Sequence, residues 1–355
     1  IIQKMGNFFT QYFASWFSCA NPHKLQYVDQ DKFVYAVPDP TQHEKPEGRT
    51  KDLISIQYKS SPQKMDRVVH QGCDTLWKAF KKTVWCHPNR PFMGQREILK
   101  QRGSFAHMAQ QPLGDYQWAT FQEVDDQVEA LSRCLVKKKF CPLIKSEVEG
   151  TPDMKFMGIF SENRPEWIVT ELASMSDSIC IVPVAVQNLF VNEERITSIL
   201  NKTELTTLCV SRFTIQIVMD LKSKGLIPNL KYLVMFDYPE DTHLTLATTV
   251  GLEVFSFTDL VNEGFKILDI PKEEPSCDTV MILGTTSGTT GEPKQAMLTH
   301  LNFISGQVCQ SYLGFDFTEE DVYLSYVPLT HVYEQIMLTN SVLFGFRIGF
   351  SSGNL

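Results

Sequence analysis

The sequence predicts an α/β protein built on doubly wound, mostly parallel sheets. From residue 155 onward, short apolar stretches alternate with segments whose apolar residues recur every three or four positions. Short apolar runs are typical of strands buried on both faces, and the longer spacing is typical of helices. Strands that alternate with helices form parallel sheets covered on both sides. The chain has 355 residues, 43% of them hydrophobic, which suffices for a large core.

The elements can be placed in order along the chain. Pro165 suits the first turn of a helix. Asn192 suits an N-cap position, and the two glutamates after it favour the start of the helix dipole. Apolar spacing predicts a helix from residue 75, another over 124–135 with the segment 114–121 before it, and a third over 213–224. We expect strands at 155–160, 179–186, 206–211, 230–237, 253–257 and 279–283.

Two regions are expected. Residues 1–67 comprise an aromatic segment and an irregular lead-in that contains several prolines and the polar run 41–52. Residues 68–355 carry the alternating elements. The boundary between the regions rests on this change in composition.

Charge and cysteine content exclude several classes of protein. The formal net charge is −8, and lysine and arginine are dispersed, so a nucleic-acid partner is not expected. The nine cysteines include no pair at the C-x-x-C spacing, which fits neither a disulfide framework nor a zinc site. Reduced thiols in a cytosol-facing protein are the simpler interpretation.

Residues 5–19 are unusually aromatic, and polar side chains interrupt them too often for a spanning helix. They suit a segment that lies in a membrane interface or docks on the protein's own core or a partner subunit, and the sequence leaves these possibilities open. Residues 5–10 also match an N-myristoylation pattern, but four residues precede it, so a chance match is favoured. We expect a membrane-associated protein, cytosol-facing or mitochondrial. The aromatic residues are Phe8, Phe9, Tyr12, Phe13, Trp16 and Phe17.

A loop rich in glycine and threonine follows the last apolar strand. Gly288 and Gly291 can adopt positive φ and turn backbone N–H groups inward around phosphate oxygens. Lys294 adds a mobile positive charge that could follow a leaving pyrophosphate. The loop fits neither Walker A nor the dinucleotide fingerprint. Its place between an apolar strand and a helix that Thr299 can cap favours phosphate binding over a flexible surface loop.

Residues 286–294, which read Thr-Ser-Gly-Thr-Thr-Gly-Glu-Pro-Lys, resemble the phosphate loop of the adenylate-forming superfamily, which includes acyl-CoA synthetases, luciferases and peptide-synthetase adenylation domains. Residues 158–167 and 321–334 resemble segments of eukaryotic long-chain acyl-CoA synthetases; the second carries Pro-Leu-Thr-His and a following glutamate. The resemblance spans roughly residues 75–355. It implies that residues 68–355 form the amino-terminal part of an AMP-binding (adenylation) domain, incomplete at its carboxyl end.

The resemblance implies ATP-dependent activation of a long-chain fatty acid, through an acyl-adenylate, to acyl-CoA. ATP, Mg²⁺ and CoA would be required, with Thr286 reaching the metal ion. Lys294, His331 and Glu334 would be the catalytic residues. Without the motif, His331 would be read as a hydrogen-bonded histidine near a turn and Glu334 as a solvated helix residue. The residues implied to hold the ATP phosphates are Thr286, Ser287, Gly288, Thr289, Thr290, Gly291 and Lys294.

The chain departs from the family's pattern at several places that bear on substrate fit. Gln295 stands where the family has Gly, Thr330 where it has Ala, and Gln335 where it has Arg; residues 183–189 lack a Tyr-Asp-Thr stretch. The family's adenine, metal and ribose motifs and its carboxyl-terminal domain with a catalytic lysine would lie beyond Leu355. The alternative is therefore a non-catalytic, synthetase-derived subunit of a larger or membrane-bound assembly.

Overall fold

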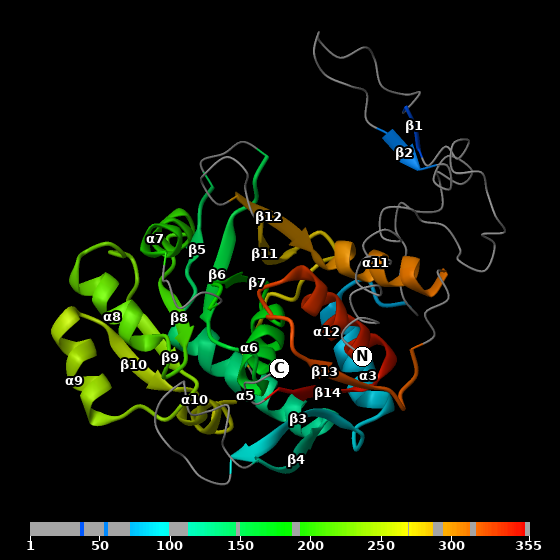
Figure 1. Ribbon diagram of the computed structural model, residues 1–355, viewed down its shortest axis with the longest axis horizontal. Coiled ribbons are helices and arrows are strands. Elements are labelled where there is room, and N and C mark those ends of the chain that lie inside the picture. Colours follow the sequence, from blue (N-terminus) through cyan, green and yellow to red (C-terminus); the bar gives the residue numbers. More distant parts are fainter. Residues whose placement is uncertain are drawn as a thin grey trace. The chain divides into compact units, whose positions relative to one another are not determined.

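The computed structural model describes residues 36–38, 53–55, 72–98, 113–146, 150–186, 192–268, 270–286, 294–312 and 317–351 (Figure 1). The chain divides into two units, Ile1–Gly72 with Ile304–Asp316, and Cys73–Phe303 with Phe317–Leu355. In the first unit, β1 (Ala36–Pro38) pairs antiparallel with β2 (Leu53–Ser55). The predicted boundary at residue 67 and the aromatic segment 5–19 lie outside the described residues and stay predictions. The two larger sheets and the candidate site belong to the second unit.

The larger sheet has the strand order β10-β9-β8-β6-β7-β11-β12, with β5 paired to β6. Every neighbouring pair from β10 to β11 is parallel, whereas β12 and β5 are antiparallel to their neighbours. The chain passes from β6 to β7 on one side and then returns to β8 on the other. The predicted doubly wound, mostly parallel arrangement is therefore confirmed. The strands are β5 (Leu143–Ile144), β6 (Met154–Phe160), β7 (Ile179–Pro183), β8 (Thr207–Val210), β9 (Tyr232–Met235), β10 (Glu253–Ser256), β11 (Val280–Thr286) and β12 (Lys294–Thr299).

Helices cover both faces of this sheet (Figure 1). On one face, α7 (Glu193–Lys202), α8 (Ile215–Ser223) and α9 (Asp241–Val250) bury apolar side chains in one cluster with alternate residues of β6, β8 and β9. On the other, α6 (Pro165–Met175) packs on β7 and α10 (Phe257–Gly264) on β10, while α5 (Phe121–Lys138) packs against both helices. Strands β6, β7, β8, β9 and β11 are mostly buried on both faces, which is why they read as continuous apolar runs.

A second sheet has the order β13-β14-β3-β4. Only β3 and β4 are antiparallel to each other in it. Helix α6 contacts β3 of this sheet as well as β7 of the larger one, so it lies between the two sheets and all its residues from Trp167 to Met175 are buried. Helix α12 (Val332–Phe344) packs on α3 (Leu76–Cys86) and is buried from Glu334 to Leu343. The strands are β3 (Pro91–Ile98), β4 (Leu113–Thr120), β13 (Val322–Ser325) and β14 (Arg347–Phe350).

The helix starts follow the local sequence. Pro165 occupies the first turn of α6, and the Asn192 side chain accepts a hydrogen bond from the Arg195 N–H at the start of α7. Thr299 and Asn302 exchange side-chain and backbone hydrogen bonds where α11 (His300–Tyr312) begins. A strand, β12, separates the glycine-rich loop from this capped helix. The sequence analysis did not predict β12, because its residues show no strand alternation.

Among the described residues, no helix combines the length and the apolar character needed to cross a membrane.

Candidate functional site

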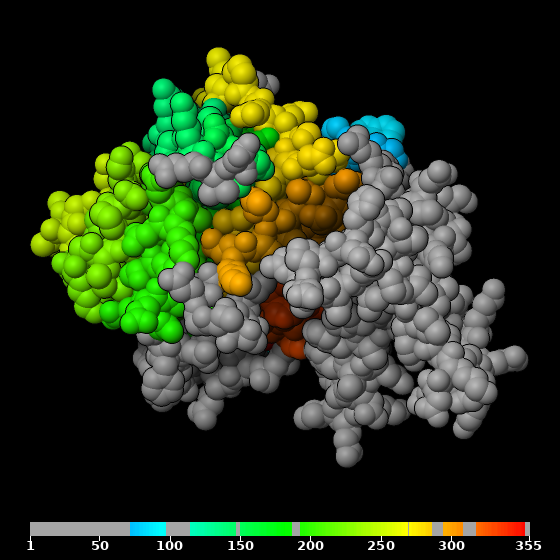
Figure 2. All heavy atoms as spheres, turned by 90° about the horizontal axis from the view of Figure 1, so that it is seen from above, coloured from blue at the N-terminus to red at the C-terminus, as the bar shows by residue number. Residues whose placement is uncertain are grey.

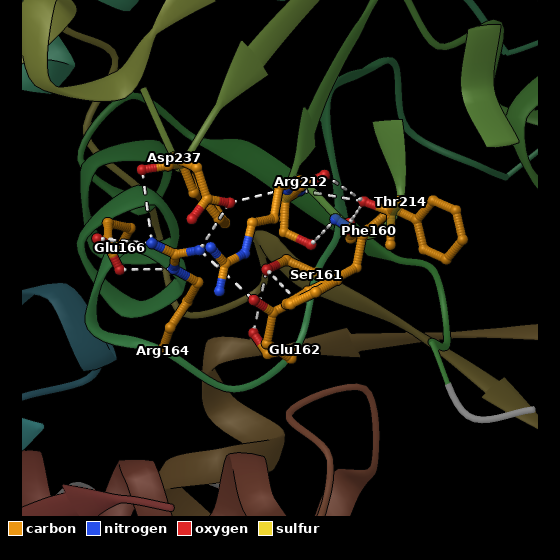
Figure 3. Close-up of polar contacts among 11 residues, drawn as sticks. Phe160, Ser161, Glu162, Arg164, Glu166, Arg212, Thr214 and Asp237 are labelled. Carbon is orange, nitrogen blue, oxygen red and sulfur yellow. Dashed lines mark hydrogen bonds and ion pairs between the residues drawn. The ribbon is translucent and has the colours of Figure 1, made fainter. Parts of the chain in front are cut away.

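An ion-paired arginine lies at the carboxyl ends of β6, β8 and β9 (Figure 3). The Arg164 guanidinium donates twice to Glu166, at 2.8 and 3.0 Å, and once to Asp237 at 3.2 Å. The Arg212 N–H donates to the same Asp237 carboxylate at 2.7 Å. Burial alone would lower the pKa of Arg164, but its carboxylate partners raise it above the ordinary value. The chain order of the sheet reverses between β6 and β8, and parallel sheets commonly bind ligands at such a point. In this protein, ion pairs between its own side chains lie there.

Asn163, at the same junction, joins the larger sheet to the loop after β13. Its amide nitrogen donates to Ser325 Oγ at 2.9 Å and to the Val327 carbonyl at 2.7 Å. Its amide oxygen accepts the Leu329 N–H at 2.8 Å. One side chain therefore binds three points of the segment 325–329, which leads directly into the predicted site residue His331.

Glu334 is only 2% exposed, so it is not a solvated helix residue. Its Oε2 accepts a hydrogen bond from the Tyr323 hydroxyl at 2.7 Å. Burial raises the pKa of Glu334 to about 7, and hydrogen bonds from Ser325 and Tyr323 only partly offset this. Near neutral pH this carboxyl exists both as the acid and as the carboxylate, which is the behaviour expected of a functional carboxyl group.

His331 is the N-cap of α12 and is exposed. Its ring Nδ1 accepts the backbone N–H of Tyr333 at 3.1 Å, and the backbone N–H of His331 donates to the Pro328 carbonyl at 2.8 Å. Because Nδ1 accepts, the neutral imidazole carries its proton on Nε2. His331 is thus a hydrogen-bonded histidine at a turn, and it also presents a ring N–H donor on an exposed side chain.

Lys294 begins β12, and in the β11–β12 pair it lies directly opposite Thr286. Lys294 is exposed, and β12 is the edge strand of the larger sheet. Figure 2 shows β12, in orange, at the molecular surface. The glycine-rich loop thus connects the paired ends of β11 and β12.

The other predicted phosphate-binding residues, Ser287, Gly288, Thr289, Thr290 and Gly291, lie outside the described residues, and for Thr286 the backbone alone is described. Their predicted contacts with ATP and with Mg²⁺ stay predictions. Within the described part of the chain, no group of three or more His, Cys, Asp or Glu side chains is placed to hold a metal ion.

The structure brings His331 and Glu334 together in the first turn of α12, where the Glu334 N–H donates to the His331 carbonyl at 3.0 Å. Lys294 lies on β12 of the larger sheet. Two buried residues adjoin this turn: Glu171 on α6, which sequence reasoning missed, and Gln335 on α12, which it named only as a departure from the family's pattern. Glu171 follows the buried Trp167 by four residues, a spacing that puts both on one helix face and was a usable signal.

This chain belongs to the family described as "AMP-binding enzyme", whose model matches residues 94–355. Among curated proteins it is similar to long-chain-fatty-acid–CoA ligase 5 of Rattus norvegicus, with 30% identity over 287 residues. It is also similar to long-chain-fatty-acid–CoA ligase 1 of Homo sapiens, with 29% identity over 289 residues. Each match covers 79% of this chain but only 38% and 37% of the relatives, so the chain spans less than half their length.

Two solved structures have the same fold. The adenylation domain of carboxylic acid reductase from Segniliparus rugosus, solved with AMP and a co-purified carboxylic acid, matches with a TM-score of 0.62 and 16% identity. That match covers 82% of this chain and 46% of the other. A long-chain-fatty-acid–CoA ligase from Archaeoglobus fulgidus matches with a TM-score of 0.55 and 18% identity, covering 78% and 46%. The predicted adenylate-forming fold is confirmed.

We predict that Asn163→Ala loosens the turn before α12. The substitution removes three hydrogen bonds and leaves partly buried backbone groups unpaired, which should lower stability by about 2–4 kcal/mol. Asn201→Ala is the control, because Asn201 is exposed and its amide makes a single bond, to the Leu226 carbonyl. Thermal unfolding of both variants checks this. Equal, small shifts in melting temperature would show that Asn163 does not hold the turn.

Proposed function

We propose that the full-length protein uses ATP to convert a long-chain fatty acid to its CoA thioester. The fatty carboxylate would attack the α-phosphorus of ATP, giving acyl-adenylate and pyrophosphate, and the CoA thiol would then displace AMP. The observation that carries the proposal is the β11–β12 hairpin, whose ends set Thr286 opposite Lys294 across a loop with the composition of a phosphate cradle. Membership of the AMP-binding enzymes and similarity to proteins named long-chain-fatty-acid–CoA ligases support it.

The loop's part would be electrostatic. Negative charge builds on the bridging and pyrophosphate oxygens during adenylation, and preorganised N–H and O–H donors lower that barrier. Residues 286–291 would provide those donors from the backbone and hydroxyl groups. Lys294, exposed at the end of the loop, would add a positive charge to the departing pyrophosphate.

We propose that Thr286 contributes a hydroxyl ligand to Mg²⁺. A single hydroxyl oxygen suits this ion, which usually keeps waters and takes further oxygens from substrate phosphates. When bound, the ion would neutralise phosphate charge.

His331 and Glu334 would border the adenylate and the acyl group. His331 would offer its Nε2–H to a substrate oxygen, since Nδ1 is already used in the helix cap. Glu334 accepts a hydrogen bond from Tyr323 and would place a buried carboxyl group, whose pKa is raised to about 7, one helical turn from His331. The Asn163 bonds tie the segment that precedes both residues.

We predict that the full-length protein exchanges pyrophosphate with ATP only when a long-chain fatty acid is present. Adenylate formation is reversible and precedes CoA, so the exchange needs ATP, Mg²⁺ and the acid alone. Labelled pyrophosphate incorporated into ATP is the measurement, with fatty acids from acetate to oleate compared. No exchange with any of these acids would reject the ligase and favour the non-catalytic subunit.

For Lys294→Ala we expect adenylation to slow by about 10² to 10³ while the melting temperature stays nearly unchanged. Loss of one positioned donor in a partly closed site typically has this effect on rate, and substitution of an exposed side chain has little effect on stability. Lys231→Ala is the control, because Lys231 is exposed at the amino end of β9, away from the loop. Thioester formation from pre-made acyl-adenylate should be much less affected. Equal slowing of both half-reactions would contradict the assigned role.

We also propose that residues 5–19 attach the protein to a membrane surface or a partner subunit, on a membrane that faces the cytosol or belongs to mitochondria. Their aromatic composition supports this. Deletion of residues 5–19 should move the protein to the soluble fraction with activity retained, whereas deletion of the polar run 41–52 should leave fractionation unchanged. If the 5–19 deletion still sediments with membranes, attachment resides elsewhere.

A further inference from the structure

We propose that Glu171 is held as a neutral carboxylic acid whose proton is donated to the side-chain oxygen of Gln335, and that this acid–amide pair positions the turn that carries His331. Only the importance of that turn for catalysis rests on the proposed function. The pairing itself follows from burial and from a count of donors and acceptors.

Both side chains lie in the interior of the second unit. Glu171, on α6, is 0% exposed, and Gln335, on α12, is 1% exposed. Gln335 Nε2 donates to the Leu329 carbonyl at 2.8 Å and to Glu171 Oε2 at 3.3 Å. Both N–H groups of the amide are therefore used. The Leu329 bond also fixes the amide's orientation, because a flipped amide would set its oxygen against the Leu329 carbonyl.

Within this pair, one oxygen of each side chain, Glu171 Oε1 and Gln335 Oε1, has no hydrogen-bond partner among the described residues. Both are acceptors if Glu171 is ionised, so neither can satisfy the other. A proton on Glu171 turns one of them into a donor. The acid O–H can then donate to Gln335 Oε1, while Gln335 Nε2 continues to donate to Glu171 Oε2. One proton removes two buried unsatisfied acceptors, each of which would otherwise be costly.

The surroundings of Glu171 also favour the neutral form. Burial raises its pKa to about 7, and the nearby N–H groups of Gln335 and Trp167 only partly offset this; the Trp167 indole N–H makes no hydrogen bond of normal geometry to a described residue. No charged group of the packed elements shifts this pKa. Most titratable groups on these elements have partners of their own. Glu166 pairs with Arg164, and Asp125 and Glu129 of α5 pair with Lys81. Arg96 of β3 donates to the Gly114 carbonyl, and Glu334 of α12 accepts from Tyr323. The other titratable groups on these elements include Arg133 of α5 and the buried thiol Cys180 of β7.

The pair acts on the site through Gln335. The same amide that meets Glu171 holds the Leu329 carbonyl, and the next turn of chain is closed by the His331 N–H to the Pro328 carbonyl. Ionised Glu171 would be a buried carboxylate without a cation, and its pull on Gln335 would compete with the Leu329 bond. Glu171 is therefore a positioning residue for His331.

The sign of the pH dependence follows. The folded-state pKa lies above the ordinary value of about 4.3 for glutamate. The pair's contribution to stability is therefore complete below about pH 4 and is lost as pH rises to about 7. The turn should be best fixed in mildly acidic solution.

Glu171→Gln in the full-length protein tests the proposal, because glutamine keeps a donor and an acceptor but cannot titrate. Melting temperatures of wild type and variant should differ in their pH dependence between pH 5 and 8, with the variant's decline shallower. Subtracting the two curves isolates Glu171 from Glu334, which titrates in the same range. Glu253→Gln, at an exposed position of β10, should retain the wild-type curve. Superimposable curves for wild type and Glu171→Gln would overturn the proposal.

Two further readouts separate positioning from bulk stability. The infrared C=O stretch of a protonated carboxyl should be present in wild type at pH 6 and lose intensity in Glu171→Gln; no difference would overturn the proposal. In the exchange assay, Glu171→Leu should lower the rate about tenfold or more, and Glu171→Gln should restore it and flatten its decline toward pH 8. If wild type shows no exchange, the proposed function fails, while the melting and infrared results still decide the pairing.

Discussion

The amide of Asn163 is the contact on which the candidate site depends. It lies where β6 ends and α6 begins, and it binds Ser325, Val327 and Leu329 on the second sheet's loop. These bonds fix the position of residues 325–329 just before α12 begins. They therefore help to fix the positions of His331 and Glu334 in its first turn. A side-chain amide suits this task, because it donates and accepts at once and carries no charge that burial would penalise.

Helices α6 and α12 share an unusual constraint: both are buried on nearly all sides and both carry polar residues. A polar group in such a place must find a partner. Glu334 finds Tyr323, and Gln335 finds Leu329 and Glu171. The paired groups converge beside the turn that precedes α12. Burial is thus the main cause of the raised pKa values of Glu171 and Glu334.

The larger sheet could be predicted from sequence because its strands are short, apolar and separated by capped helices. Pro165 and Asn192 marked helix starts correctly, and the regions expected for β6 to β11 match the structure within a few residues. The edge strands β12 and β13 and the strand β3 went unpredicted. Residues 294–299 mix polar and apolar side chains on both faces, and β3 pairs on one side with β14, far away in sequence, so local pattern carries little information about either.

The site was only partly predictable. The residues 331–334 were found by resemblance to a motif, yet the burial of Glu334 and the capping role of His331 depend on tertiary packing. Asn163 lies inside a recognised stretch but showed no sign of its role, because its partners are more than 160 residues away. Glu171 sits among apolar residues on a helix face, and its importance depends on Gln335, which only the folded chain brings near.

The ion pairs of Arg164 have a consequence for the protein in salt. Its side chain is only 13% exposed, and those of Glu166 and Asp237 are each 25% exposed, so dissolved ions screen this network weakly. Lys294, in contrast, is exposed, and its attraction for phosphate would fall steeply as ionic strength rises. Concentrated salt should therefore weaken the hold on a nucleotide long before it disturbs the junction of β6, β8 and β9. The protein would lose its ligand while keeping its shape.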